Sequence, residues 1–499
     1  MRIMKRFTEK ENQVWNLKKA TMVNAVSKFS IIIWNLFFSA ILARLLNPSD
    51  YGVVAIITVF TNFFILFADM GIGPAIIQKK ELQDVDIDRI FTFTLFLGVG
   101  LAFVFSCLSF AFVKIYDNTV YYSVGPLLGL NLALSSFNMV PQAVLMRKKL
   151  FISNGVRNIV ATIFSSLVAL VIAFMGGKYY AIVIQNLISS IVILLWNLLT
   201  TKVHLNFKQI LKSVRLIWGY SSFQFAFGLI NYFSRNLDNL LTGYYFGNAA
   251  LGYYDKSYRL MRYPVENLTA VITPSMQPIL SDYQNNIKYV EIQYVKIVKF
   301  LSTVGVFIGA ICFCASREVI ILYFGSQWEK SVTSFHILSA VLPFQMVVGV
   351  SGSIYQSVNK TKQMFLSGLG GAIITISSIV VGIILGSINS LALCYAVGFL
   401  LNFIQSQFFL ALTCFKVRVW NLFKIFIPEF LIFCMMVIAM SFLPNIDNLF
   451  WSLVFKLLVG ILVYIVMMTV TKNWKYLLVV LPTRLKEKLS QSKFRFLLQ

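Results

Sequence analysis

The sequence is poor in charged residues and has almost no histidine. Charged residues make up 12% of the 499 positions, and there are only two His. Because soluble domains carry about a quarter charged residues, this composition excludes an ordinary soluble protein. Two His exclude a multi-His metal site, and the six Cys lie in apolar stretches without metal-ligand spacing. We therefore expect neither a metal centre nor a disulfide framework.

Catalytic and nucleotide-binding motifs are also missing. The chain has no Walker A sequence, which excludes a P-loop ATPase. No loop between the apolar runs offers a carboxylate pair or a catalytic triad. A membrane-embedded enzyme of glycan assembly would need such a loop, so we expect no enzymatic activity and no cofactor. A membrane-embedded glycan-assembly enzyme stays open as the alternative to a transporter.

Hydrophobic length is what the sequence has in abundance. Hydrophobic residues make up 58% of the chain, and the mean hydropathy is +0.77. Apolar runs of about twenty residues predict an all-α polytopic membrane protein with about fourteen transmembrane helices. The predicted helices are 20–46, 52–77, 90–113, 121–145, 156–175, 180–199, 215–246, 249–280, 297–323, 332–358, 364–386, 390–414, 425–443 and 450–471.

The positive charges are distributed unequally between the two sides of this arrangement. Of the 43 Lys and Arg residues, only Lys114, Lys178 and Lys330 fall on the loops opposite the N-terminus. Eight are counted within the predicted helices, and those at the first residues of a helix are counted with the adjoining segment; the eight are Lys28, Arg44, Arg235, Lys256, Arg259, Arg262, Arg317 and Lys456. The remainder fall in segments on the side of the N-terminus, which predicts that both termini are cytoplasmic. We interpret the net charge of +24 as topology and attraction to anionic lipids, not as nucleic-acid binding.

The chain also shows an internal repeat at a shift of 200 residues. Gly52 falls opposite Gly252, Pro74 falls opposite Pro274, and helices 3 to 6 start at the same spacing as helices 9 to 12. A parallel repeat of two six-helix halves is typical of transporters. The predicted organisation is a basic cytoplasmic N-terminus (1–19), a first half (20–199), a cytoplasmic linker (200–214), a second half (215–414), helices 13 and 14 (425–471) and a basic amphipathic cytoplasmic tail (472–499).

Four stretches resemble a known family. Residues 39–52, 67–80, 246–256 and 324–328 are similar to motifs of the polysaccharide transporters, the Wzx-type flippases of the multidrug/oligosaccharidyl-lipid/polysaccharide flippase superfamily. The resemblance implies translocation of an undecaprenyl-pyrophosphate-linked oligosaccharide across the bacterial inner membrane, by alternating access. The product would be O-antigen, capsule or exopolysaccharide. Polysaccharide polymerase and glycosyltransferases are the partners it implies, and we expect a monomer.

Charged residues inside the helices indicate where a substrate binds. Asp255, Arg259, Arg262 and Glu266 follow the spacing i, i+4, i+7 and i+11, which is one helical face. Arg259 lies about 16 Å from the outer turn, near the middle of the membrane. A guanidinium fork matches phosphate oxygens, so Arg259 and Arg262 are the first candidates for pyrophosphate binding. Further candidates are Arg235, Lys256 and Lys28.

Carboxylates and prolines complete the candidate site. Glu266, Asp238, Asp255 and Asp69 are candidates for proton or sodium coupling, and Pro264 and Pro274 for gating. A structural explanation stays open, because Asp255–Arg259 and Arg262–Glu266 have the spacing of intrahelical ion pairs. Lys28 would then extend to the cytoplasmic headgroups instead of contacting substrate.

Two alternatives from the same superfamily also remain. A lipid II flippase would use the same cavity chemistry. A cation/drug antiporter would share the fold but should have a net acidic cavity, whereas the charges of helices 7 and 8 favour an anionic ligand.

Overall fold

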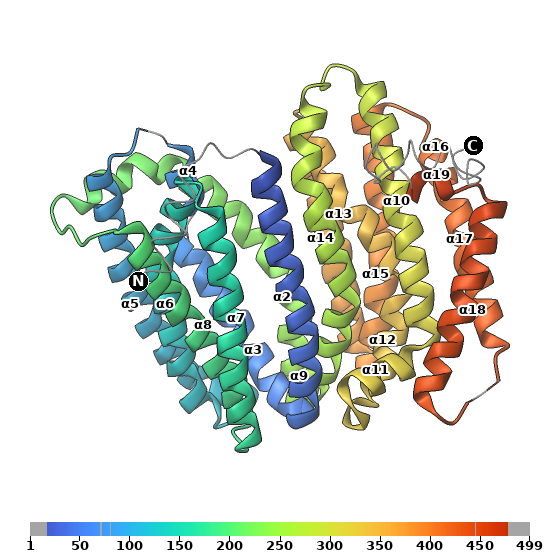
Figure 1. The fold of residues 1–499 in the computed structure, drawn as a ribbon, viewed down its shortest axis with the longest axis horizontal. Helices are drawn as coiled ribbons and strands as arrows, with labels where there is room; N and C mark the ends of the chain where they lie inside the picture. The colour runs from blue at the N-terminus through green and yellow to red at the C-terminus, as the bar shows by residue number, and fades with distance from the viewer. Residues whose placement is uncertain (1–16, 70–71, 80, 445, 478–499) are drawn as a thin grey trace. The chain divides into compact units, whose positions relative to one another are not determined.

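The computed structural model describes residues 17–69, 72–79, 81–444 and 446–477, and every regular element in these ranges is helical (Figure 1). The chain divides into two compact units, Met1–Gly252 and Tyr253–Gln499. The first unit holds α2 (Leu17–Leu45), α3 (Pro48–Asp69), α4 (Ile72–Gln78), α5 (Asp84–Tyr116), α6 (Tyr121–Arg147), α7 (Phe151–Phe174), α8 (Tyr180–Thr201) and the start of α9 (Ile210–Ser281). The division falls inside α9.

The second unit continues from the later part of α9. It holds α10 (Ile287–Cys314), α11 (Ser316–Phe324), the short 3-10 helix η1 (Ser326–Trp328), α12 (Ser331–Ser339), α13 (Leu342–Ser357), α14 (Thr361–Ile384), α15 (Ile388–Phe409), the π-helical turn η2 (Leu410–Phe415), α16 (Val419–Phe423), the 3-10 helix η3 (Lys424–Phe426), α17 (Ile427–Ser441), α18 (Leu449–Val470) and α19 (Trp474–Leu477).

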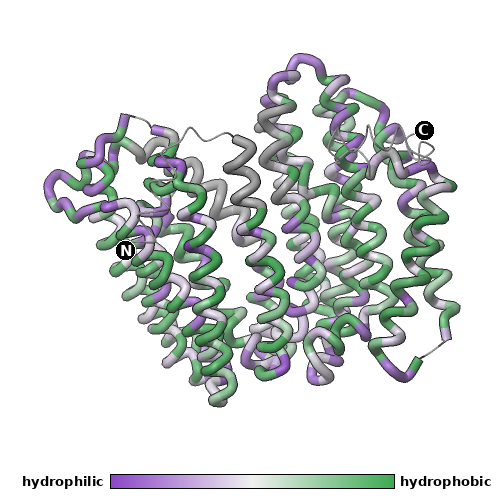
Figure 2. Tube along the Cα trace, viewed as in Figure 1, coloured by the Kyte–Doolittle hydropathy of each residue, from purple (hydrophilic) through white to green (hydrophobic). Residues whose placement is uncertain are grey.

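The described helices confirm the all-α polytopic class. Eleven are long and apolar enough to cross a membrane, or twelve if the bent pair α12–α13 forms one span. Hydrophobic residues run along the helices and hydrophilic residues gather mostly at their ends and turns (Figure 2). The two arms of α9 are helical but are not among these apolar spans, so the count of fourteen stays a prediction. So does the division into six-helix halves. Most of the segments 1–19 and 472–499 lies outside the described residues.

The break between the predicted helices 215–246 and 249–280 is confirmed. Within α9 the backbone departs from helical dihedral angles at Gly247, where φ is 80° and ψ is 174°. Glycine adopts this region without the steric cost of a Cβ. Pro264 and Pro274 lie in stretches of α9 that keep helical angles, so a gating role for them stays a prediction.

Three of the predicted helices are each divided into two in the structure. The predicted run 52–77 is α3 and α4. The predicted run 297–323 is α10 and α11: α10 begins ten residues earlier than predicted, and the break between the two helices lies at Ala315. The run 332–358 is α12 and α13, bent by 58°. Pro343 at the start of α13 explains this bend, because its ring crowds the carbonyl four residues earlier, at the last residue of α12. Apolar length alone does not detect such breaks.

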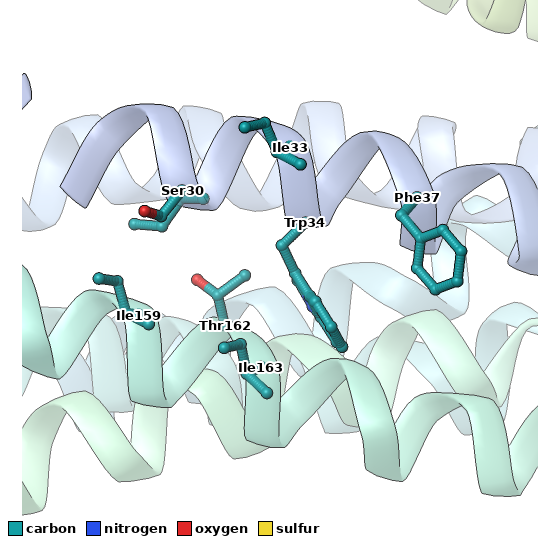
Figure 3. Close-up of a pocket in the computed structure, with 8 residues that line it drawn as sticks. Ser30, Ile33, Trp34, Phe37, Ile159, Thr162 and Ile163 are labelled. Atoms are coloured by element: carbon teal, nitrogen blue, oxygen red, sulfur yellow. The ribbon is translucent and has the colours of Figure 1, made fainter. Parts of the chain in front are cut away.

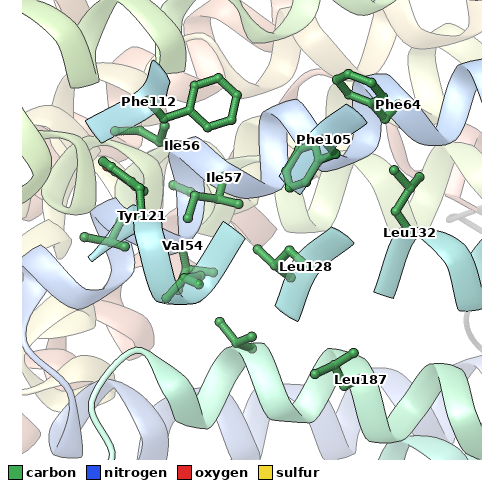
Figure 4. Close-up of a cluster of buried hydrophobic side chains, with 14 of the residues drawn as sticks. Val54, Ile56, Ile57, Phe64, Phe105, Phe112, Tyr121, Leu128, Leu132 and Leu187 are labelled. Atoms are coloured by element: carbon green, nitrogen blue, oxygen red, sulfur yellow. The ribbon is translucent and has the colours of Figure 1, made fainter. Parts of the chain in front are cut away.

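The first unit has a buried apolar core around α6. Tyr121, Val124, Leu128 and Leu132 of α6 meet side chains of α3, α5 and α8, including Ile57, Phe105 and Leu187 (Figure 4). The α6 positions repeat every three or four residues, so one face of the helix is buried. This packing sets which way the other faces of α6 point.

Two short turns meet in the first unit without room for side chains. A Cβ on Gly52 would lie 1.7 Å from the carbonyl oxygen of Asn248, and a Cβ on Gly252 would lie 1.9 Å from the carbonyl oxygen of Pro48. Tyr121 also donates a hydrogen bond to Asn248 Oδ1 at 3.0 Å. The two glycines that the repeat placed opposite each other in sequence are thus in close contact, and each is required by backbone approach.

We predict that Gly52→Ala and Gly252→Ala each lower the thermal unfolding midpoint in detergent. Alanine normally stabilises a helix by up to about 1 kcal/mol relative to glycine, but here backbone must move, at a cost of about 1–3 kcal/mol. Gly100→Ala is the matched control, because Gly100 lies in α5 with nothing within 4 Å of a Cβ. If the three variants unfold at the same temperature, the close contact between the turns is wrong.

Candidate functional site

Four charged residues of α9 form two ion pairs on one face in the second unit. Arg259 Nε lies 2.7 Å from Asp255 Oδ2, and Arg262 Nη2 lies 2.7 Å from Glu266 Oε1. Both pairs have the i, i+4 spacing that the sequence predicted. The helix period therefore places two guanidinium groups about one turn apart, each beside a carboxylate.

The two ends of the Arg259–Asp255 pair differ in exposure. The Asp255 side chain is 5% exposed, whereas the Arg259 side chain is 61% exposed. Arg259 Nε also donates to Asp255 Oδ1 at 2.9 Å. Within the described part of the chain, all hydrogen bonds of Arg259 run from Nε to this one carboxylate. Its two terminal Nη groups therefore remain available to an anion, in the fork geometry that phosphate prefers.

Arg262 is held more firmly than Arg259. Its Nη1 donates to the Tyr258 hydroxyl at 3.2 Å, and its guanidinium lies 5.2 Å from the centre of the Tyr258 ring. Tyr258 in turn hydrogen-bonds the hydroxyl of Tyr395 at 2.9 Å. Contacts to a tyrosine and a carboxylate fix the side chain, which is 22% exposed. Arg262 is thus a positioned cation, and Arg259 is the more accessible one.

Lys256 lies against aromatic rings of α11 and η1 and not beside the two arginines. It is buried, and its Nζ lies 4.9 Å from the centre of the Phe324 ring and 5.7 Å from that of Trp328. This cation–π contact holds α9 against α11 and η1. The structure therefore does not bring Lys256 together with Arg259 and Arg262, and its role in substrate binding stays a prediction without geometric support.

The candidates of the first unit are spread over three helices. Lys28 is exposed on α2. Asp69 ends α3 and accepts a backbone hydrogen bond from Gly73 of α4, as a helix cap would. Asp238 is 1% exposed and accepts from the backbone N–H of Asn239 at 2.9 Å. The side chain of Arg235 lies outside the described residues, as does that of Pro274 in the second unit.

An apolar pocket, open on one side, lies in the first unit. A cavity of about 450 Å³ lies between α2 and α7, lined by Trp34, Phe37, Ile159, Ile163 and their neighbours (Figure 3). Lys28 is not among the residues that line it. The cavity therefore has no charged group for a phosphate and is not the candidate site.

Sequence reasoning missed a buried ion pair in the second unit. Lys299 Nζ lies 2.8 and 2.9 Å from the two oxygens of Glu429, and both side chains are nearly inaccessible. Asn473 donates to the same carboxylate at 3.3 Å. The pair connects α10 to α17 and to the turn between α18 and α19. The count of basic residues had placed Lys299 in a cytoplasmic segment; the longer α10 takes it inside the bundle.

It also missed a buried cation in the first unit. Arg157 of α7 is 3% exposed, although the count of basic residues placed it in a cytoplasmic segment. Its Nη1 donates to Asn197 Oδ1 at 2.6 Å and to Gln142 Oε1, and its Nη2 donates to Asn154 Oδ1 at 2.8 Å. Nη2 and Nε both donate to Asn158 Oδ1, at 2.6 and 3.1 Å. Five donors are thus satisfied by neutral amides, and no carboxylate among the described residues pairs with this guanidinium. The amide-rich sequence around Arg157 was the available signal.

Comparison with known proteins shows to which protein family the chain belongs. The family model for a polysaccharide biosynthesis protein matches residues 41–333, which include the four charged residues of α9. The chain belongs to this polysaccharide biosynthesis protein family. The family predicted from the sequence motifs is thereby confirmed.

Individual relatives are also named as polysaccharide biosynthesis proteins. The chain is 23% identical over 393 residues to the teichuronic acid biosynthesis protein TuaB of Bacillus subtilis (strain 168), covering 78% of this chain and 80% of that protein. It is also 23% identical over 374 residues to the lipopolysaccharide biosynthesis protein WzxC of Escherichia coli (strain K12), covering 72% and 73%.

A solved structure shows the same fold. The lipid II flippase MurJ, in its inward closed conformation, superposes with a TM-score of 0.72 at 14% identity, over 91% of this chain and 99% of that chain. This likeness establishes the fold. With the apolar helices, it shows that the protein is a multi-pass membrane protein with the fold of that flippase.

Proposed function

We propose that the protein is a flippase that moves a polyprenyl-pyrophosphate-linked oligosaccharide across the bacterial inner membrane for the synthesis of a surface polysaccharide. The observation that carries this proposal is Arg259, anchored at Nε by Asp255 and open at both Nη groups. Membership of the polysaccharide biosynthesis family supports it. In this proposal both termini are cytoplasmic, as the distribution of Lys and Arg indicates.

The energetic problem of such a substrate is its charged head. An ionised group placed in hydrocarbon without partners costs tens of kcal/mol by simple solvation estimates. Arg259 and Arg262 would replace water around the pyrophosphate, while the polyprenyl chain stays in lipid. Alternating access would expose this charged face first to the cytoplasm and then to the opposite side. No covalent step is needed, so the protein would act as a transporter and not as an enzyme.

The paired carboxylates suit release as well as binding. With both pairs formed, the two cations and two anions of the face sum to zero. A pyrophosphate arriving at Arg259 meets a cation whose charge Asp255 already partly neutralises, so the substrate would be held but not trapped. Asp255 is buried, and therefore keeps its hold on Nε while the Nη groups bind and release the substrate.

The observations disfavour a cation/drug antiporter more strongly than a lipid II flippase. A lipid II flippase would use the same cations, and only the family favours a surface polysaccharide. A cation/drug antiporter would need an acidic group open to its ligand. Here Asp255 is buried and Glu266, although 60% exposed, is occupied by Arg262. The accessible free donors belong to a cation, which favours an anionic ligand.

Energy coupling and partners are part of the proposal. We expect no cofactor, and proton or sodium antiport would use Glu266, whose exposed carboxylate is paired with a substrate-binding arginine. Asp238 and Asp69 are less suited because each accepts a local backbone hydrogen bond. The protein would act as a monomer among anionic lipids, next to glycosyltransferases and a polysaccharide polymerase.

We predict that Arg259→Ala and Arg262→Ala abolish surface polysaccharide in a strain that depends on this protein, with lipid-linked oligosaccharide accumulating on the cytoplasmic leaflet. Arg→Lys at either position should keep the charge but lose the fork, and transport should fall about tenfold. Protein in the membrane is measured by immunoblot, and polysaccharide by gel electrophoresis.

Arg317→Ala is the matched control. Its side chain is 59% exposed and its Nε lies 2.9 Å from Glu329 Oε1, almost the exposure and geometry of Arg259, but outside the α9 face. This variant should transport normally. Normal polysaccharide in both α9 alanine variants would show that the pairs are structural, and loss in Arg317→Ala would show that any surface pair has the same effect.

A separate prediction concerns coupling. In proteoliposomes, an imposed pH or sodium gradient should speed substrate movement by wild type, and Glu266→Gln should remove this acceleration while leaving gradient-free movement in place. The measurement is the rate at which labelled substrate becomes accessible on the far leaflet. Rates that ignore both gradients in wild type would identify a facilitator driven by removal of product.

A further inference from the structure

A narrow polar stripe runs along α6 in the first unit. Asn131, Ser135, Asn138 and Gln142 follow the spacing i, i+4, i+7 and i+11, so they share one face of the helix. All four side chains are partly exposed. Of the eleven apolar spans, α6 has the lowest mean hydropathy, 1.2. A hydrogen-bonding face at bilayer depth is costly against lipid, so this face is suited to water or a polar ligand.

The rotation of α6 is fixed by a different face. A Cβ on Gly129 would lie 2.6 Å from Ser106 Oγ of α5, and Ser136 Oγ donates to the carbonyl oxygen of Thr94 at 2.8 Å. Gly129 and Ser136 are about 130–160° around the helix from the polar stripe, by the helix period. Close packing against α5 therefore keeps the stripe on a side of α6 that does not face α5.

Arg157 determines which atoms the stripe presents. Because the guanidinium has only donors, it takes the amide oxygen of Asn197, at 2.6 Å. The amide nitrogen of Asn197 then donates to Asn138 Oδ1, at 2.7 Å. The NH₂ group of Asn138 is consequently turned away from this network. The buried charge thus imposes the amide orientation, which is otherwise ambiguous between oxygen and nitrogen.

Two more positions offer free hydrogen-bonding groups. Ser190 donates to Asn131 Oδ1 at 2.7 Å, which leaves the NH₂ group of Asn131 for another partner. Among the described residues, none accepts a hydrogen bond from Asn131 Nδ2, Asn138 Nδ2 or the Ser135 hydroxyl. The three groups extend over about 10 Å of helix, enough to meet several hydroxyls of one extended ligand.

We propose that Asn131, Ser135 and Asn138, the α6 stripe, bind the glycan of the lipid-linked substrate. This inference rests on the proposed function. Amide and hydroxyl groups match sugar hydroxyls, which both donate and accept, and they do so without charge. Each such bond contributes little net free energy in contact with water, so a glycan would be guided without being retained. Arg157 is a positioning residue, because it reaches the ligand only through Asn197 and Asn138.

The test compares two substrates in proteoliposomes: polyprenyl pyrophosphate carrying a complete oligosaccharide, and polyprenyl pyrophosphate carrying a single sugar. The triple variant Asn131→Ala, Ser135→Ala, Asn138→Ala should move the oligosaccharide substrate about tenfold more slowly than wild type, since hydrogen bonds of modest net strength are lost. Movement of the single-sugar substrate should change less than about threefold. Ser123→Ala on the same helix is the control, because the Ser123 hydroxyl is exposed outside the stripe and donates to the carbonyl oxygen of Val120.

Ser135 keeps the test decisive if the triple variant fails to fold. Its hydroxyl has no partner among the residues described, so Ser135→Ala removes nothing from the bundle, and Ser135→Leu obstructs the stripe. The leucine variant should slow the oligosaccharide substrate more than the alanine variant does, with the single-sugar substrate nearly unchanged. Equal effects on both substrates, or on neither, would overturn the inference alone. If wild type moves neither substrate, the proposed function falls with it.

Discussion

Charged and strongly polar groups inside this helical body need partners, because hydrocarbon offers none. The molecule meets this constraint in three ways. Lys299 and Glu429 neutralise each other in the second unit. Arg157 is surrounded by amide oxygens in the first. Arg259 is only partly satisfied, since Asp255 takes its Nε and leaves the terminal nitrogens open.

The difference between these three sites is the basis of the functional account. Breaking a buried pair such as Lys299–Glu429 typically costs about 3–5 kcal/mol, so its main effect is to hold helices together. A fully satisfied guanidinium such as Arg157 has no donor to offer and acts by orienting its neighbours. A half-satisfied and exposed guanidinium can exchange ligands. The two units accordingly provide different chemistry: a cationic group in one, and neutral amide and hydroxyl groups in the other.

Much of this could be predicted from sequence, for reasons that particular residues make clear. The face of Asp255, Arg259, Arg262 and Glu266 follows from helix period alone, and both predicted ion pairs form. Helix breaks at Ala315 and before Pro343 were not predicted, because apolar runs continue through them. The burial of Arg157 and Lys299 was missed because both lie near the starts of the predicted helices 156–175 and 297–323, where charge normally means solvent, whereas α7 and α10 begin earlier. The burial of Lys256 against aromatic rings depends on tertiary packing, which no local pattern encodes.

The proposed function depends on recognition of the anionic head of the substrate by Arg259 and Arg262. The most direct measurement is protein-dependent movement, in proteoliposomes, of one labelled oligosaccharide carried either on polyprenyl pyrophosphate or on uncharged polyprenol. The account predicts that wild type moves the pyrophosphate-linked form, that it moves the uncharged form far more slowly, and that the double variant Arg259→Ala, Arg262→Ala loses this preference. Equal movement of both forms by wild type, or an unchanged preference in the double variant, would contradict it.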